Sequence, residues 1–315
     1  KIIQKRRDFM GVVSDFVDGI ESAVKDFLND AVTQTLKTTF ELLQGGLDTS
    51  KADGIGGMFQ QFLSVHPATF TGGGSTGATA IWTTIEKVCN DAVVPVAGMV
   101  FAIVVINDLM QMVMNNNNFK DIDDSIFVRW ILKVVCGVLL ISNTYYIASG
   151  FFAFGTKATA TAMTTLLGTN AFSGNISVAS DYGIGMLIVL LLLSLIILVG
   201  VFVMLAVIVV VLASRMIEIF MYLGISPLPM ATMMGGQWSE VGKNWFRGLV
   251  ALAFQGLFII LALGIFSTMF TNALAKLSSG GSAIMQMAIL LGYTLALIFT
   301  ILRSGAISKS IFNAH

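Results

Sequence analysis

The chain has 315 residues, of which 56% are hydrophobic and only 11% are charged, and its mean hydropathy is +0.84. This composition is typical of polytopic membrane proteins and excludes an ordinary soluble globular domain. The 18 basic and 18 acidic side chains cancel, so the chain has no overall basic charge with which to attract nucleic acid or acidic partners.

The first predicted element is an amphipathic helix over residues 5–43. Apolar side chains recur there mostly every three or four residues, with charged side chains between them. These positions are Phe9, Val13, Phe16, Ile20, Val24, Phe27, Ala31 and Leu36. The pattern favours a helix that packs on its own protein; a helix in the membrane interface or on a partner subunit is the alternative. The glycine-rich residues 45–57 and 71–79 are predicted loops.

The run from Tyr182 to Ser214 contains no Asp, Glu, Lys, Arg, His, Asn, Gln or Pro. A helix of this length covers roughly 50 Å, whereas the bilayer hydrocarbon is about 30 Å thick. A break at Gly200 would leave two pieces too short to span. We therefore predict one long helix, whose excess turns tilt, kink or contact other protein outside the lipid.

Four further apolar segments bring the predicted number of membrane spans to five. In chain order, the spans cover residues 92–114, 126–152, 182–214, 249–270 and 283–302. They form a transmembrane domain over residues 81–304, preceded by an N-terminal region of residues 1–80 and followed by a short tail of residues 305–315. The predicted fold class is all-α, a polytopic helical membrane protein with an N-terminal amphipathic helix.

Basic side chains near the span ends predict the orientation, because cytoplasmic loops hold the excess of Lys and Arg. One side holds Lys120, Arg129, Lys133, Arg215, Lys243, Arg247, Arg303 and Lys309, and the other holds Lys87, Lys157 and Lys276. This predicts a cytoplasmic C-terminus and an N-terminal region outside, although the basic residues near Arg6 argue against it. The weakly polar residues 155–180 are predicted as an outer loop, with a segment that lines a passage as the alternative.

Charged side chains within spans are candidates for function, because each costs roughly 2.5–3.5 kcal/mol at a helix centre. Asp108 and Lys133 are predicted at similar depth in a hairpin, where they form an ion pair near Arg129. Arg215 and Glu218 are three residues apart and are predicted to pair on one helix face. The sequence has no acids spread through the depth of the membrane, as a proton or ion pathway would need.

The two histidines and two cysteines, His66, His315, Cys89 and Cys136, lack the spacing of a metal site or a catalytic triad. We therefore predict no catalytic residues, no metal, no cofactor and no enzyme activity.

A helix-packing signal lies in the last span. Ala288, Gly292 and Ala296 follow the spacing of small residues that lets another helix approach closely in lipid. The spacing leaves open whether that helix belongs to the same subunit or to a neighbour.

Three stretches of the sequence carry a family resemblance. They read INDLMQMVMNNNNFKDIDDSIFVRWILK with ISNTYYI after it, RMIEIFMYLGISPLPMATM, and GGQWSEVGKNWFRGLVALAFQGLFII. In combination they resemble the TrbL-like polytopic membrane subunit of type IV secretion and conjugation systems, in the form found in Gram-positive mobile elements. The resemblance covers roughly residues 80–305. It implies about five spans in the bacterial cytoplasmic membrane, an extracytoplasmic N-terminus and a cytoplasmic C-terminus.

The resemblance also implies a function. It implies a membrane channel or scaffold component of a conjugative DNA transfer apparatus, present in several copies beside other type IV secretion membrane subunits and cytoplasmic ATPases, with relaxase-bound single-stranded DNA as the cargo. The matching motif places an inner loop at Pro227, Pro229, Trp238, Glu240, Gly242, Asn244 and Arg247. The alternatives are a stand-alone small-solute transporter or ion channel, and an assembly scaffold that conducts nothing.

Overall fold

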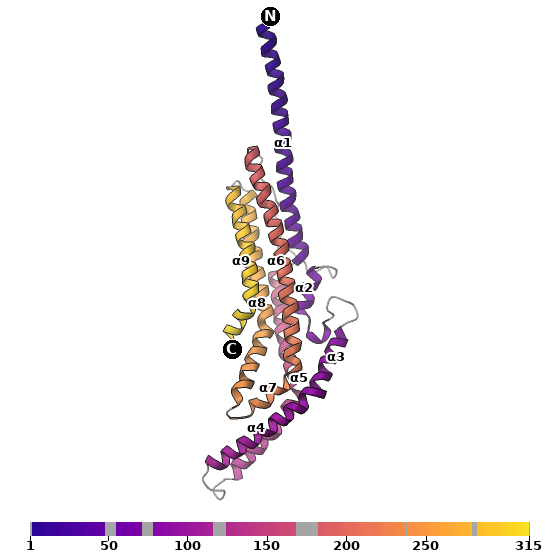
Figure 1. Cartoon of the computed structure of the whole chain (residues 1–315), viewed down its shortest axis with the longest axis vertical. Helices are drawn as coiled ribbons and strands as arrows, with labels where there is room; N and C mark the ends of the chain where they lie inside the picture. The colour runs from indigo at the N-terminus through magenta and orange to yellow at the C-terminus, as the bar shows by residue number, and fades with distance from the viewer. Residues whose placement is uncertain are drawn as a thin grey trace. The chain divides into compact units, whose positions relative to one another are not determined.

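The structure is a computed structural model that describes residues 2–47, 55–70, 78–115, 124–167, 182–236, 238–278 and 282–314, and these residues include no strand. The α-helices, labelled in Figure 1, are α1 (Ile2–Leu47), α2 (Ile55–Ser64), α3 (Ala78–Val88), α4 (Val94–Asn115), α5 (Asp124–Leu166), α6 (Ile184–Gly224), α7 (Pro227–Met233), α8 (Ser239–Ser278) and α9 (Ala283–Ile311). A 3₁₀ turn, η1 (Pro67–Thr69), follows α2, and a π-helical turn, η2 (Cys89–Val93), follows α3. The predicted all-α class is confirmed.

Five helical segments of the described chain are long and apolar enough to cross a membrane. They are Ile81–Met114, Phe127–Leu166, Ile184–Gly224, Ser239–Leu277 and Ala283–Ile311. The longest of them is α6, which runs for 41 residues without a break at Gly200. The chain is a polytopic helical membrane protein, and the predicted single long helix is confirmed.

Several helices extend beyond the predicted spans. α5 continues to Leu166 through the first part of the predicted outer loop, and α9 continues to Ile311 through most of the predicted tail. α8 begins at Ser239, so most of the predicted inner loop is helical. The spans were predicted from hydropathy, which reports contact with lipid, whereas a helix ends where its backbone hydrogen bonds end. The helices therefore run past the predicted spans, and the prediction of a loop from residue 155 was wrong for its first part, which is helical to Leu166.

The added turns of α5 show how weakly polar residues stay helical. Thr159 donates its hydroxyl to the Gly155 carbonyl at 2.8 Å, and Thr161 donates to the Lys157 carbonyl at 3.0 Å. These bonds along the helix satisfy the hydroxyls without breaking it. Gly155 also lies so close to the Ala253 carbonyl of α8 that a Cβ there would overlap it. Residues 168–181, the rest of the predicted outer loop, lie outside the described residues.

The first span begins with a change of helix type before its proline. The N–H of Val94 bonds to the carbonyl of Cys89, five residues earlier, and η2 connects α3 to α4 without a loop. Pro95 has no N–H and its ring crowds the preceding turn, so a wider π turn accommodates it. Residues 48–54 and 71–77 of the predicted loops lie outside the described residues.

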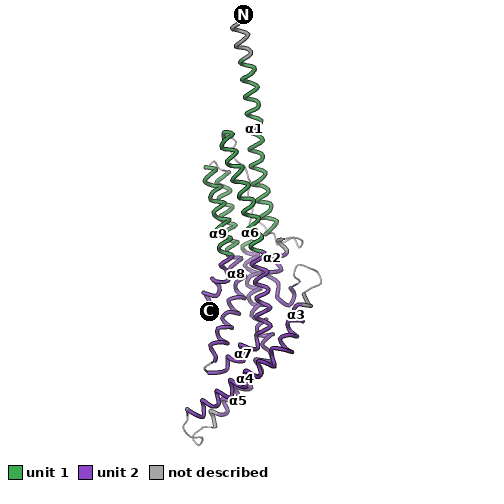
Figure 2. Tube along the Cα trace, in the orientation of Figure 1, with its two compact units in different colours: residues 1–56, 166–208, 262–301 green, residues 57–165, 209–261, 302–315 purple. Residues whose placement is uncertain are grey.

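The chain divides into two compact units, coloured in Figure 2. Unit 1 comprises residues 1–56, 166–208 and 262–301, from α1, α6, α8 and α9. In this unit a Cβ on Gly46 of α1 would lie only 2.9 Å from Leu205 of α6, whereas a Cβ on Gly200 would lie at an ordinary 3.7 Å from Leu291 and Thr294 of α9. The absence of a side chain at Gly46 lets α1 and α6 approach closely.

Unit 2 comprises residues 57–165, 209–261 and 302–315. Its main core gathers aromatic and aliphatic side chains from α5, α6 and α8 around Phe152, Leu223 and Leu252. A smaller cluster joins Phe101 of α4 to Ile141 of α5 and Ala231 of α7. Both clusters position the polar residues described below.

Candidate functional site

Asp108 of α4 and Lys133 of α5 form an ion pair in unit 2. The Lys133 ammonium donates to Asp108 Oδ2 at 2.6 Å, and the two side chains are 38% and 23% exposed. The structure thus brings together two residues that the sequence placed at similar depth. Arg129, one turn earlier on α5, is exposed.

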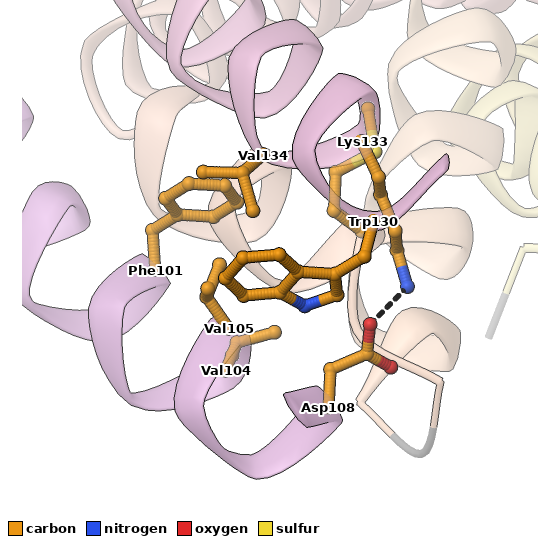
Figure 3. A pocket seen from close by; sticks show the side chains of 8 residues that line it. Phe101, Val104, Val105, Asp108, Trp130, Lys133 and Val134 are labelled. Carbon is orange, nitrogen blue, oxygen red and sulfur yellow. Dashed lines mark hydrogen bonds and ion pairs between the residues drawn. The ribbon is translucent and has the colours of Figure 1, made fainter. Parts of the chain in front are cut away.

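A small cavity of about 10 Å³ lies beside this ion pair. Its walls are Phe101, Val104, Val105, Asp108, Trp130, Lys133, Val134 and Met234. Figure 3 shows the indole of Trp130 among these apolar side chains, with its nitrogen on the edge nearer Asp108. The indole nitrogen is buried and makes no hydrogen bond within the described residues. The cavity has room for about one water molecule, so it is far too small for a substrate.

The turn between α7 and α8 packs onto the same hairpin. A Cβ on Gly235 would overlap Val104, and a Cβ on Gly236 would lie 3.7 Å from Asp108 Oδ1. Gly137 of α5 likewise lies so close to the Phe101 ring that a side chain there would overlap it. The ion pair therefore lies where α4, α5 and the turn between α7 and α8 meet. This position indicates a structural role, in which the pair connects the three elements.

Arg215 of α6 is buried at 1% exposure. Its guanidinium donates to the carbonyls of Phe62 at 3.1 Å, Leu252 at 3.3 Å and Ala253 at 3.3 Å. Phe62 lies in the last turn of α2, where carbonyls lack partners within the helix. A cation there also interacts favourably with the helix dipole, so Arg215 caps α2 and holds it to unit 2.

The predicted pair of Arg215 and Glu218 is not what the structure shows. In the described part of the chain no carboxylate lies within ion-pair distance of Arg215, and Glu218 is half-buried on the same helix. Burial removes Arg215 from water, so its five N–H groups take the carbonyls that packing brings near. Gly256 makes room, because a Cβ there would lie only 3.1 Å from the guanidinium. Spacing along one helix could not reveal partners 37 to 153 residues away.

The motif expected in an inner loop is divided between α7 and α8. Pro227 is buried in the first turn of α7, where a missing N–H costs nothing. The Pro229 carbonyl accepts from the Thr232 hydroxyl at 2.8 Å. Gly242 of α8 fits against α7, since a Cβ there would lie 2.6 Å from that carbonyl. The motif thus includes one close helix contact.

The other motif residues lie at the surface of unit 2. Trp238 is 51% exposed just before α8 begins, and Arg247 is exposed on that helix. Glu240 and Lys243 form an exposed ion pair at 3.1 Å, and Asn244 is half-buried one residue further. Exposed pairs of this kind contribute little to stability.

The small-residue face of α9 is exposed in unit 1. Ala288, Gly292 and Ala296 are all exposed, and no atom lies within 4 Å of a Cβ built on Gly292. The buried face of α9 consists of Met287, Leu290, Thr294, Leu297 and Ile301. The small residues therefore face away from the rest of this chain's described packing.

An aromatic cluster around His66 could not be assembled from sequence. His66 Nδ1 accepts from the Ala68 N–H at 3.1 Å, so Nε2 is the protonated nitrogen of the neutral ring, and it donates to the Ser149 carbonyl at 3.3 Å. The ring lies near Trp82, which in turn contacts Tyr145. No sequence pattern pointed to this cluster, since α3 carries a single aromatic side chain, Trp82. These contacts connect η1, α3 and α5 and include no nucleophile–base pair.

The comparisons with known proteins give one family. A family described as "TrbL/VirB6 plasmid conjugal transfer like protein" matches residues 69–227, which is half of the chain. The match includes α3 to α6 and ends at the start of α7. No curated protein and no solved structure matches.

Proposed function

Because the chain belongs to the TrbL/VirB6 plasmid conjugal transfer-like family, we propose that several copies surround the path of transferred DNA in a type IV secretion apparatus. Membership makes the chain a membrane component of conjugative transfer, in a lipid environment and beside other subunits of the transfer system. The proposal adds the copy-to-copy packing, the passage and the cargo.

The observation that carries the proposal is the exposed small-residue face of α9. Large apolar side chains make the most contact with lipid, whereas small residues allow two helices to pack closely. Gly292 and its neighbours one turn away, Ala288 and Ala296, offer such a surface and are not covered by this chain's described residues. A helix from a neighbouring copy fits this face.

The length of α6 supports an assembly as well. Its 41 residues cover roughly 60 Å at about 1.5 Å per residue, twice the thickness of the bilayer hydrocarbon. Lipid cannot cover that length in an upright helix. In the proposed assembly, the excess turns project beyond the lipid and contact other protein.

The proposed cargo is single-stranded DNA with its relaxase, delivered by cytoplasmic ATPases. The exposed cations of the described chain are few, and on α8 Lys243 is paired with Glu240. A chain with no net charge offers little electrostatic attraction to phosphates. In this proposal other subunits bind the DNA strongly and this subunit forms a passage with weak contacts.

We also propose an orientation in the bacterial cytoplasmic membrane. The excess of Lys and Arg supports a cytoplasmic C-terminus and an extracytoplasmic N-terminal region. Such an arrangement places the hairpin of α4 and α5, with the Asp108–Lys133 pair, at the cytoplasmic side.

The test is the mass of the complex extracted gently from its native membrane, with identification of the proteins that purify with it. An oligomer that carries secretion ATPases and other transfer subunits is the expected result. A compact monomer without them would overturn the proposal and favour the stand-alone transporter. If the subunit formed an oligomer but its deletion left DNA transfer intact, the proposal that it forms the passage would be overturned.

A further inference from the structure

The first half of α1 exposes apolar side chains that no described residue of unit 1 covers. The exposed apolar residues between Met10 and Phe27 are between 37% and 72% exposed, and they are Met10, Val12, Val13, Phe16, Val17, Ile20, Val24 and Phe27. Figure 2 shows this part of α1 extending past the other helices of unit 1. A folded protein does not leave such a long apolar stripe in water without a partner.

The spacing of these residues identifies the kind of partner. Six of them, Met10, Val13, Val17, Ile20, Val24 and Phe27, recur at intervals that alternate between three and four residues, which is the a and d pattern of a coiled coil. The pattern is kept over about two and a half heptads, and Val12 and Phe16 lie beside it at c and g positions. We call these six residues the α1 seam. Val17 and Val24 occupy a positions, where β-branched side chains pack well.

Charged residues lie outside the seam. In the same heptads, Asp15 is at an f position, Asp18 and Lys25 are at b positions, and Asp26 is at a c position. These positions face away from a partner helix. Glu21, at an e position, already forms an ion pair with Lys25 at 2.7 Å. In a parallel coiled coil, each g position meets the e position five residues further on the partner. The pairs that result are Phe16 with Glu21, Ala23 with Leu28, and Asp30 with Thr35, none of which opposes like charges.

The seam is not a continuation of the face that α1 buries in unit 1. The apolar residues of that face are Val32, Leu36, Phe40 and Leu43 in the second half of the helix. Leu36 lies nine residues after Phe27, which is two and a half turns at about 3.6 residues per turn, and therefore on the opposite side. The helix thus has one face for its own chain and another left free.

A membrane surface is a poor partner for the seam. Helices that lie in the membrane interface present a polar face rich in Lys and Arg to anionic lipids. Between Met10 and Asp30 the polar side chains of α1 include five carboxylates and one lysine. Anionic headgroups would repel this face, so the charge pattern favours a helix as the occupant.

We propose that the α1 seam binds the α1 seams of further copies of this chain in a parallel coiled coil. Copies inserted in one membrane share one orientation, which makes their α1 helices parallel. The inference rests on the oligomeric state in the proposed function and names the surface that holds the copies together on the side of the N-terminal region.

The test uses the full chain in native membranes of cells that contain the whole transfer system. Cys136 is exposed and is replaced by Ser to remove background coupling. One variant then carries Val17→Cys on the seam, and the matched control carries Asp18→Cys at the adjacent outer position. Oxidation is expected to couple two V17C chains and to leave D18C chains uncoupled, since a disulfide needs Cβ atoms about 4 Å apart. Adding Ile20→Asp to V17C should abolish the coupling.

Three results would overturn the coiled coil: no V17C dimer, equal dimer from V17C and D18C, or an adduct with a different protein. The mass of the extracted complex keeps this failure separate from that of the proposed function. An oligomer without V17C coupling removes the coiled coil alone, because the copies then associate through their spans. A monomer removes the oligomeric passage itself and the coiled coil with it.

Discussion

At the scale of single residues, Arg215 connects more distant segments than any other charged side chain that the sequence indicated as a candidate for function. The Leu252 and Ala253 carbonyls belong to the interior of α8 and are also within reach of the helix's own N–H groups. The Phe62 carbonyl, in the last turn of α2, depends on its partner. The main role of Arg215 is therefore to hold α2.

Replacing Arg215 with Met is expected to destabilise the protein by on the order of 2–3 kcal/mol, because the Phe62 carbonyl loses a charged donor. Arg215→Lys keeps the charge but not the planar group that reaches three carbonyls, so it should recover only part of the loss. The measurement is the thermal unfolding midpoint of the purified protein in a mild detergent.

The matched control is Arg247→Met, which removes an exposed arginine from α8 and should leave the midpoint nearly unchanged. Equal midpoints for R215M and R247M would show that Arg215 does not hold α2.

The Asp108–Lys133 pair predicts coupling between two substitutions. Asp108→Asn or Lys133→Gln alone leaves a half-buried charge without its partner. The double variant removes both charges, so its destabilisation should be smaller than the sum of the single effects, by about 1 kcal/mol. Thermal unfolding of the wild type and the three variants measures this difference. Additive effects would mean that the pair contributes nothing.

At the scale of elements, glycines determine how closely the helices approach. Gly242→Ala places a Cβ 2.6 Å from the Pro229 carbonyl and 2.8 Å from Met233 Cβ, so α7 and α8 must separate. The expected cost is roughly 1–3 kcal/mol. In Gly150→Ala, on α5, the new methyl meets no atom within 4 Å, and this control should not lower the unfolding midpoint. A midpoint of G242A at or above that of G150A would contradict the contact.

The exposed face of α9 gives a prediction about association. A Cβ at Gly292 meets no described atom of this chain within 4 Å, so Gly292→Leu should let the subunit fold normally while neighbouring copies lose their close approach. With Ile20→Asp also present, so that the α1 seam does not hold the copies together, the mass of the extracted complex should fall. Gly98→Leu, at an equally open glycine on α4, is the control in the same background and should leave the mass unchanged. An intact complex with G292L in that background would exclude this face as the contact.

At the scale of the whole molecule, the charge asymmetry predicts sidedness. With Cys136 replaced by Ser, a cysteine at Ser14 should react with a membrane-impermeant maleimide on intact cells whose outer layers are made permeable to it. A cysteine at Asn313 should react only after the membrane is opened. The reverse labelling pattern would show that the orientation is opposite to the proposed one, as the basic residues near Arg6 would favour.

Sequence reasoning succeeded where a local pattern is sufficient. The apolar run around Gly200 could be identified as one helix, and the hairpin spacing placed Asp108 beside Lys133. It failed for the helix ends at Leu166 and Ile311, because hydropathy falls at the lipid boundary while helical hydrogen bonds continue.

The sequence by itself determined the all-α class, the number of spans and the resemblance to a conjugal transfer family, because hydrophobic length and local motifs depend only on neighbouring residues. Only the tertiary structure decided the partners of Arg215, the cavity beside Trp130 and which faces of α1 and α9 stay free. Those features depend on contacts between residues far apart in the chain, and a pattern within one helix does not say which distant residues of the same chain pack against it.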